Sequence, residues 1–217
     1  MSTVQLQGYR ELVARMGAAG RRHMPFAVAK ALTQTAWQTS AAETTHIKQV
    51  FDKPTPFTQR AVGVTPATKA KLQARIFVKD VQAKYLAVEA IGGRRAFKTF
   101  EERFAGGGPA QFALPGRGVG LNQYGNITKA KIKRIAADIE TFNSNKRFFK
   151  GVPKGGGLPM GIYARANNNK HITTLIRFST EATYKKRFEF SAVANETITA
   201  NFEANLVSAW EAALRSG

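Results

Sequence analysis

The chain has 217 residues, which is enough for one sizeable domain or two small ones. Hydrophobic residues make up 43% of it, so a core can form, and this argues against wholesale disorder. The formal charge is +19, from 33 basic and 14 acidic residues. Such an excess predicts a partner that is a polyanion, DNA above all, or an acidic protein surface.

The chain contains no cysteine, which excludes disulfides and thiolate zinc sites. No apolar run approaches the roughly 18 to 20 residues that a membrane-spanning helix needs. The first residues, MSTVQLQGYRELV, lack the basic-then-apolar layout of a signal peptide. We therefore expect no membrane contact, and folding and assembly in a reducing cytoplasm.

Apolar residues at helical spacing predict two helices in the N-terminal part of the chain. The first is expected over residues 3–16. The second has Pro25 in its first turn, where a missing N–H is harmless, and runs to about Phe51. A connector rich in Pro and Thr follows, to Thr68, because residues before Pro avoid the helical region.

Alternating apolar and polar residues predict a strand over Leu72–Lys79, and a short helix is expected over Val81–Ile91. Residues 94–125 carry two clusters of Gly and Pro, and we expect a long, mobile loop there. Apolar residues at positions i, i+3, i+4 and i+7 predict a helix over Ile132–Ile139. Bases precede the acids in that stretch, which opposes the helix dipole. Something other than local helix stability then explains the basic start, and a ligand surface is one candidate.

The C-terminal part reads as a hairpin followed by a long helix. The runs GIYARA and ITTLIRFS flank Asn167–Asn169, and Asn tolerates the positive φ of a tight turn. Apolar residues recur every four positions from about Phe188 to Leu214. The predicted fold class is α+β, with N-terminal and C-terminal helices packed on a small antiparallel sheet. We expect a single domain over 1–217, with 94–125 as a Gly/Pro-rich loop insertion.

No motif of an enzyme is found. His23, His46 and His171 are scattered, and adjacent Glu101 and Glu102 point about 100° apart on a helix, which makes a poor acid–base pair. The glycine clusters match neither the dinucleotide fingerprint nor the phosphate loop GxxxxGK[ST]. We expect no catalytic residue, no cofactor and no metal.

Three stretches interleave bases with aromatics, and the predicted helix adds a fourth group of bases. The basic side chains of such clusters can neutralise phosphates while the aromatic rings stack on nucleobases. Alternatively, the rings enter the core and the basic side chains stay in solvent. No helix-turn-helix, zinc finger or aromatic sheet motif is present, so sequence-specific reading is not expected. The candidate residues for contact with DNA or a protein partner are Arg94, Arg95, Lys98, Lys129, Lys131, Lys133, Arg134, Lys146, Arg147, Lys150, Lys185, Lys186 and Arg187.

Charge is also segregated along the chain. Residues 144–180 carry seven bases and no acid, whereas the last helix carries acids at Glu189, Glu196, Glu203 and Glu211. A chain with a basic middle and an acidic end can pair head to tail with copies of itself, and such contacts close into rings when the rotation allows.

In order and texture, most of the chain resembles the minor tail and neck (head–tail completion) proteins of tailed bacteriophages, in particular the minor tail protein Z family. The resemblance rests on MPFAVAKALTQTAWQTS, then DKPTPFTQRAV, the strand KLQARIFVKD, a Gly-rich basic middle, the pair GIYARA and TTLIRF, and TYKKRFEF before the closing helix.

The resemblance implies a structural virion protein of the tail and neck region, assembled in the host cytoplasm. It implies a ring of about six or twelve copies that joins head and tail and lines or seals the DNA channel. Portal, adaptor or tail proteins would be its neighbours, and viral DNA would be held by non-specific electrostatics. The alternative is a non-specific nucleic-acid-binding protein of chromatin-associated or packaging type.

Overall fold

The computed structural model describes residues 2–5, 17–105, 111–140, 147–155, 157–166 and 171–215. Helices and small antiparallel sheets make up the fold, with long helices toward both ends, so the α+β class is confirmed. The chain divides into two compact units. Unit 1 comprises Met1–Gly92 and Lys185–Gly217, and unit 2, Gly93–Tyr184, is inserted between these two segments. Two units thus stand where the sequence predicts a single domain.

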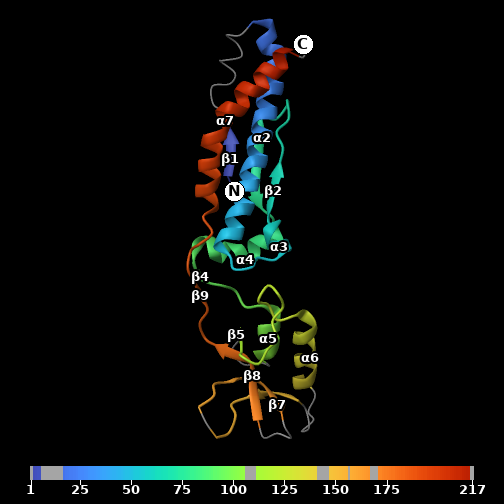
Figure 1. Cartoon of the computed structure of the whole chain (residues 1–217), viewed down its shortest axis with the longest axis vertical. Coiled ribbons are helices and arrows are strands. Elements are labelled where there is room, and N and C mark those ends of the chain that lie inside the picture. Colours follow the sequence, from blue (N-terminus) through green and yellow to red (C-terminus); the bar gives the residue numbers. More distant parts are fainter. Residues whose placement is uncertain are drawn as a thin grey trace. The chain divides into compact units, whose positions relative to one another are not determined.

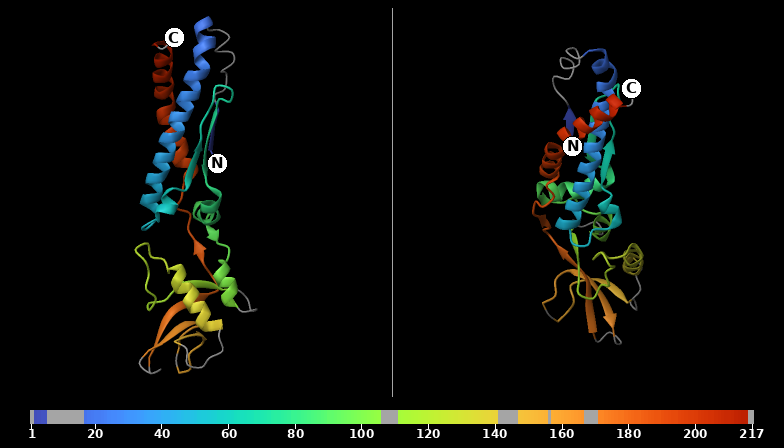
Figure 2. Two further views of the ribbon diagram at one scale, coloured as in Figure 1. Left: turned by 90° about the vertical axis from the view of Figure 1, so that its right-hand side faces the viewer. Right: turned by 45° about the horizontal axis from the view of Figure 1, so that its top comes forward.

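Unit 1 is built on two long helices, α2 (Ala18–Val50) and α7 (Phe190–Arg215), which lie side by side in all views (Figures 1 and 2). An antiparallel sheet of order β1-β3-β2 packs against them, with β2 and β3 against α2 and β1 against α7. Its other elements are β1 (Ser2–Gln5), α3 (Pro56–Gln59), β2 (Val62–Thr65), β3 (Gln73–Val78) and α4 (Asp80–Ile91).

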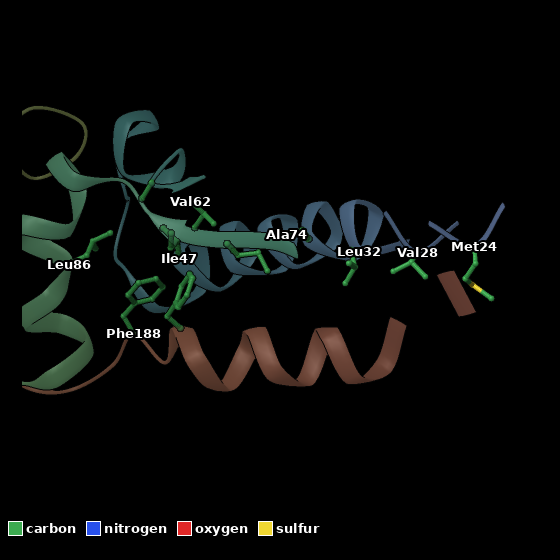
Figure 3. Packing of buried hydrophobic residues seen from close by; sticks show 12 residues of the cluster. Met24, Val28, Leu32, Ile47, Val62, Ala74, Leu86 and Phe188 are labelled. Carbon is green, nitrogen blue, oxygen red and sulfur yellow. The ribbon is translucent and has the colours of Figure 1, made fainter. Parts of the chain in front are cut away.

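The main core of unit 1 lies between α2, the sheet and α4. Figure 3 labels some of its side chains: Met24, Val28, Leu32 and Ile47 come from α2, and the other labelled ones come from β2, β3, α4 and the segment before α7. A second contact joins the two long helices through small residues. Ala27 and Ala31 of α2 are buried against Ala209 and Ala213 of α7, so the two backbones can approach closely.

Polar side chains also lie in the α2–α7 contact. The Asn205 amide nitrogen donates to the Thr35 hydroxyl oxygen at 2.8 Å and to Gln38 Oε1 at 2.7 Å. One turn further along α2, the Thr39 hydroxyl donates to the Thr35 carbonyl at 2.9 Å. Glu43 follows on the same side of α2; its side chain is fully buried, and no described residue hydrogen-bonds its carboxyl oxygens.

Three predictions in unit 1 need correction. The helix expected over 3–16 is wrong for residues 3–5, which lie in β1 because β3 offers them a free edge; residues 6–16 lie outside the described chain. Helix α2 begins at Ala18, so Pro25 is inside it rather than in its first turn, and buried Met24 and Val28 hold that region in the core. The connector after Phe51 contains α3 and β2, since β2 pairs with the other edge of β3.

Unit 2 contains a four-stranded antiparallel sheet of order β5-β8-β7-β6. Helix α6 packs beside it, against β6 (Figure 2). A two-stranded pair, β4 with β9, lies where the chain enters and leaves the unit. The elements are β4 (Gly93–Arg94), α5 (Thr99–Ala105), β5 (Phe112–Pro115), α6 (Lys129–Glu140), β6 (Phe148–Gly151), β7 (Gly161–Ala166), β8 (His171–Ser179) and β9 (Thr183–Tyr184).

The stretch 94–125 is not a long loop where the structure describes it; residues 106–110 lie outside the description. It supplies β4, α5 and β5, and its second glycine cluster continues along β8. The Gly116 and Gly118 amides donate to the Leu175 and Thr174 carbonyls at 2.8 and 2.9 Å. A Cβ at Gly116 would lie 2.4 Å from the Thr174 carbonyl oxygen, so this glycine serves close backbone approach.

The other predicted elements match the structure to within a few residues, whereas β6 and β9 are not predicted from the sequence. Strand β3, helices α4, α6 and α7, and the antiparallel pair β7–β8 all form. Along β3, Ala74 and Ile76 are fully buried and Arg75 is exposed, as the alternating pattern predicts. The predicted turn at Asn167–Asn169 lies outside the described residues.

A candidate anion-binding groove

Unit 2 carries a groove of about 410 Å³ between α5 and α6. Among the described residues that line it, four are basic and none is acidic. The basic side chains are Lys98 and Arg103 on the α5 side and Lys129 and Lys133 on α6. The rest of the lining is Thr99, Phe100, Phe104, Ile132 and Ala136. An apolar surface bordered by cations suits an anion that also offers a flat or apolar part.

Helix α6 adds its own positive end to the groove. Its first residue is Lys129, and Thr128 precedes it: the Thr128 hydroxyl oxygen accepts from the Lys131 amide at 3.3 Å. The first turn contains no acid, so the partial positive charge of the helix N-terminus is not compensated there. Lys133 lies one turn after Lys129 on the same side. Backbone amides and cations at a helix N-terminus favour phosphate and other anions.

The buried Glu101 carboxylate holds α5 in place. It accepts from both terminal nitrogens of Arg95, at 2.5 and 2.7 Å, from the Lys98 amide at 2.7 Å and from the Ala113 amide in β5 at 2.9 Å. Burial alone would raise the pKa of Glu101, but the hydrogen bonds from Arg95, Lys98 and Ala113 lower it below its usual value. This ionised carboxylate therefore ties the segment before α5, α5 itself and the sheet together.

The same network affects Lys98. Desolvation and the nearby Arg95 charge lower the pKa of the Lys98 ammonium, and the Glu101 carboxylate offsets this only in part. A bound anion would favour the charged form of Lys98, since it adds negative charge to that of Glu101.

Three of the predicted contact residues meet in the groove: Lys98, Lys129 and Lys133. Arg103 and Phe100 also line it, and the sequence analysis missed them because it placed them in a loop rather than on α5. A helical reading of TFEERFA would have placed Phe100 and Arg103 three residues apart, on one face.

Other predicted residues of unit 2 have structural contacts. Arg95 pairs with Glu101, and Arg94 donates to the Thr180 carbonyl at 2.9 Å while its guanidinium lies over Phe112. Lys150 donates to the Phe104 carbonyl. Arg95 and Lys150 are therefore held by contacts within unit 2, whereas Arg94 makes its contacts at the surface and remains exposed.

The rest lie elsewhere. Lys131 and Arg147 lie over the ring of buried Phe148, at 5.5 and 5.8 Å from its centroid, and Arg134 is exposed on another side of α6. Lys146 lies outside the described residues.

Lys185, Lys186 and Arg187 belong to unit 1. There Lys186 pairs with Glu189 and Arg187 makes two hydrogen bonds to Glu89. In the clusters around Phe148 and Phe188 the rings are buried, which agrees with the alternative that the aromatics belong to the core.

The described residues contain no group of three or more His, Asp or Glu side chains that could hold a metal ion. His46 has a structural contact: its Nε2 accepts from the Glu189 amide at 3.2 Å and its ring stacks on Phe188. No helix in the described part of the chain is both long enough and apolar enough to span a membrane.

No family model matches the chain, and comparisons with curated proteins and with solved structures give no significant match. The functional reading therefore rests on the geometry and charge of the molecule itself, together with the resemblance in sequence order described above.

Proposed function

We propose that this chain is a structural virion protein of a tailed bacteriophage, a minor tail or neck component that works as an oligomer and holds polyanions, DNA foremost, in the groove of unit 2. The observation that carries the polyanion part of the proposal is the groove itself: four bases converge on an apolar floor beside a helix N-terminus, with no acid among the described lining. The virion part rests on the resemblance in sequence order. That arrangement neutralises phosphates and reads no sequence.

The distribution of charge supports a polyanion as the ligand. Unit 2 holds 16 bases and five acids in Gly93–Tyr184, so it carries more than half of the net charge in less than half of the chain. A concentrated positive field raises the local concentration of an anionic partner and speeds its approach. Duplex DNA presents one charge about every 1.7 Å and releases counterions on binding, which makes it a strong ligand for such a surface.

The place in a virion is tested by quantitative peptide mass spectrometry on particles purified from the source. The proposal expects this chain at a low, fixed copy number, about six to twelve per particle, relative to the major shell protein, as a closed cyclic assembly requires. Finding the chain only in the soluble or nucleic-acid fraction would contradict the virion assignment.

The second candidate is a non-specific nucleic-acid-binding protein outside a particle. The same groove favours it, because phosphate contacts by bases are sequence-independent. The two candidates differ in stoichiometry: a packaging protein covers nucleic acid in proportion to its length, whereas a neck component has a copy number that the length of the DNA does not change.

A further inference from the structure

A second surface lies in unit 1, on the side of α2 that faces neither α7 nor the sheet. A groove of about 650 Å³ runs there between α2 and the segment after β2. Phe26 and Trp37 line it, and they are 42% and 56% exposed. Lys30 and Lys69 also line it, and the Lys69 ammonium lies 5.2 Å from the centroid of the Phe26 ring. Large exposed rings bordered by cations mark an interaction site.

The charged residues exposed on the outer side of α2 are basic. Arg22, Lys30 and Lys48 are exposed on the helix, and its single acid, Glu43, is buried on a different side. We name the surface formed by Phe26, Lys30, Trp37 and Lys69 the α2 groove. A partner for it has to offer apolar side chains and negative charge together.

Helix α7 carries such a face. At about 100° per residue, positions seven apart lie on nearly one side of a helix, and Glu196 and Glu203 are so placed, as are Val207 and Leu214. All four fall on one side and all are exposed, with Val207 and Leu214 at 52% and 48%. Exposed Glu211 lies on the same side. We name this surface the α7 acidic face.

We propose that the α7 acidic face of one copy docks in the α2 groove of a second copy of this chain. Val207 and Leu214 would cover the rings of Phe26 and Trp37, and the glutamates would lie near Lys30 and Lys69. The proposal rests on the oligomeric part of the proposed function and names the surfaces that make it.

Charge decides which copies can meet. Two α2 grooves brought together would oppose bases to bases, and two α7 acidic faces would oppose acids to acids, so pairing of like surfaces is repelled. Within one copy, α2 and α7 already contact each other through other sides, at Ala27, Ala31, Ala209 and Ala213. Each copy therefore presents one groove and one acidic face, and the contact is heterologous: it continues from copy to copy and closes into a ring where the rotation allows.

The test uses the full chain and two variants that each disable one surface. The groove variant is Lys30→Glu with Lys69→Glu, and the face variant is Glu196→Lys with Glu203→Lys. Light scattering after size-exclusion chromatography measures the mass at about 100 µM chain, a concentration that populates micromolar contacts. Circular dichroism and a thermal melt check that each variant is folded. Lys84→Glu with Lys185→Glu makes the same charge change as the groove variant, at exposed residues outside both surfaces.

Wild type and the Lys84/Lys185 control are expected to form oligomers, and each disabled variant is expected to be monomeric, with at least a tenfold loss of association. An equimolar mixture of the two disabled variants is expected to give a 1:1 dimer and nothing larger, since it contains one working groove and one working face. A monomeric wild type, disabled variants that assemble as wild type does, or a mixture without dimers would each overturn the contact. Those outcomes leave the particle measurement unaffected, so the two proposals fail separately.

Discussion

At the scale of single residues, Glu101 explains why the Gly-rich middle of the chain is folded. Its carboxylate is fully buried and accepts four hydrogen bonds from the segments before and after it. From the sequence, Glu101 is considered only together with Glu102, as a poor acid–base pair. Nothing in the local sequence shows that Arg95 and Ala113 converge on it, because that convergence depends on the sheet.

Replacing Glu101 with Gln should destabilise unit 2 by about 3–5 kcal/mol, because it leaves Arg95 without its counter-charge in a site closed to water. The exposed neighbour offers a matched control: Glu102→Gln should change the free energy of unfolding by less than about 0.5 kcal/mol. Urea unfolding monitored by circular dichroism measures both. Equal effects of the two substitutions would show that the network does not hold the unit together.

The same carboxylate gives unit 2 a dependence on acid. Its folded pKa lies below the unfolded value, so its stabilising contribution is fully present above the unfolded pKa and is lost as the pH falls through the folded pKa.

Glu43 should act in the opposite direction in unit 1. Burial without a hydrogen-bond partner among the described residues raises its pKa to about 8. The folded state therefore keeps a proton that the unfolded state releases near pH 4, and the free energy of unfolding should fall by about 1.4 kcal/mol per pH unit between those values. The lost stability returns as the pH falls to the unfolded pKa, where Glu43 is protonated in both states.

The variant Glu43→Gln keeps the shape and cannot ionise. We expect it to match wild type near pH 5 and to be more stable by about 2 kcal/mol or more at pH 8. At pH 8 folding of the wild type must either protonate a carboxylate that is ionised in the unfolded state or bury its charge, and both cost free energy. Urea unfolding at the two pH values measures the difference, and Glu211→Gln at an exposed position of α7 is the control. A pH-independent difference would mean that Glu43 does not titrate as its burial predicts.

At the scale of elements, the α2–α7 pair depends on small residues. Ala31 and Ala209 are at most 1% exposed in the helix contact. Replacing Ala31 with Leu should cost about 1–3 kcal/mol, since the added atoms force the helices apart. Ala41 is exposed on the same helix, so Ala41→Leu should be close to neutral. Thermal melts compare the two; similar losses would place the helix contact elsewhere.

The elements that the sequence predicts are those with a strong local period: most of α2, β3, α4, α6, α7 and the β7–β8 pair. It does not reveal the short elements β1, α3, β2, β4, α5, β5, β6 and β9, and the strands among these depend on distant partners. Val4 lies opposite Ala74 and Phe148 lies opposite Ala164, pairings that no local window contains. Tertiary pairing outweighs the helical spacing of residues 3–5 in the same way.

At the scale of the whole molecule, charge is what the sequence predicts best. The excess of bases and the unfavourable basic start of α6 both point to a ligand surface, and Lys129 and Lys133 do line the groove. Only some of the other candidate residues line the groove, because composition cannot show which basic side chains are already paired within the chain. Arg95 pairs with Glu101, and Arg187 pairs with Glu89. Arg103 lines the groove because it lies on α5, a helix that the nearby glycines make hard to predict from the sequence.

The measurement that tests the central claim most directly is the salt dependence of duplex DNA binding by the full chain, by fluorescence anisotropy on a short duplex of mixed sequence. We expect binding at low salt. The slope of log K against log salt should become shallower by about 2 in the variant Lys129→Gln with Lys133→Gln, because two phosphate contacts are lost. The control, Lys71→Gln with Lys84→Gln, removes the same charge from exposed residues of unit 1 and should keep the wild-type slope. If the two variants lose affinity and slope alike, or if wild type does not bind at low salt, the groove between α5 and α6 is not a polyanion site.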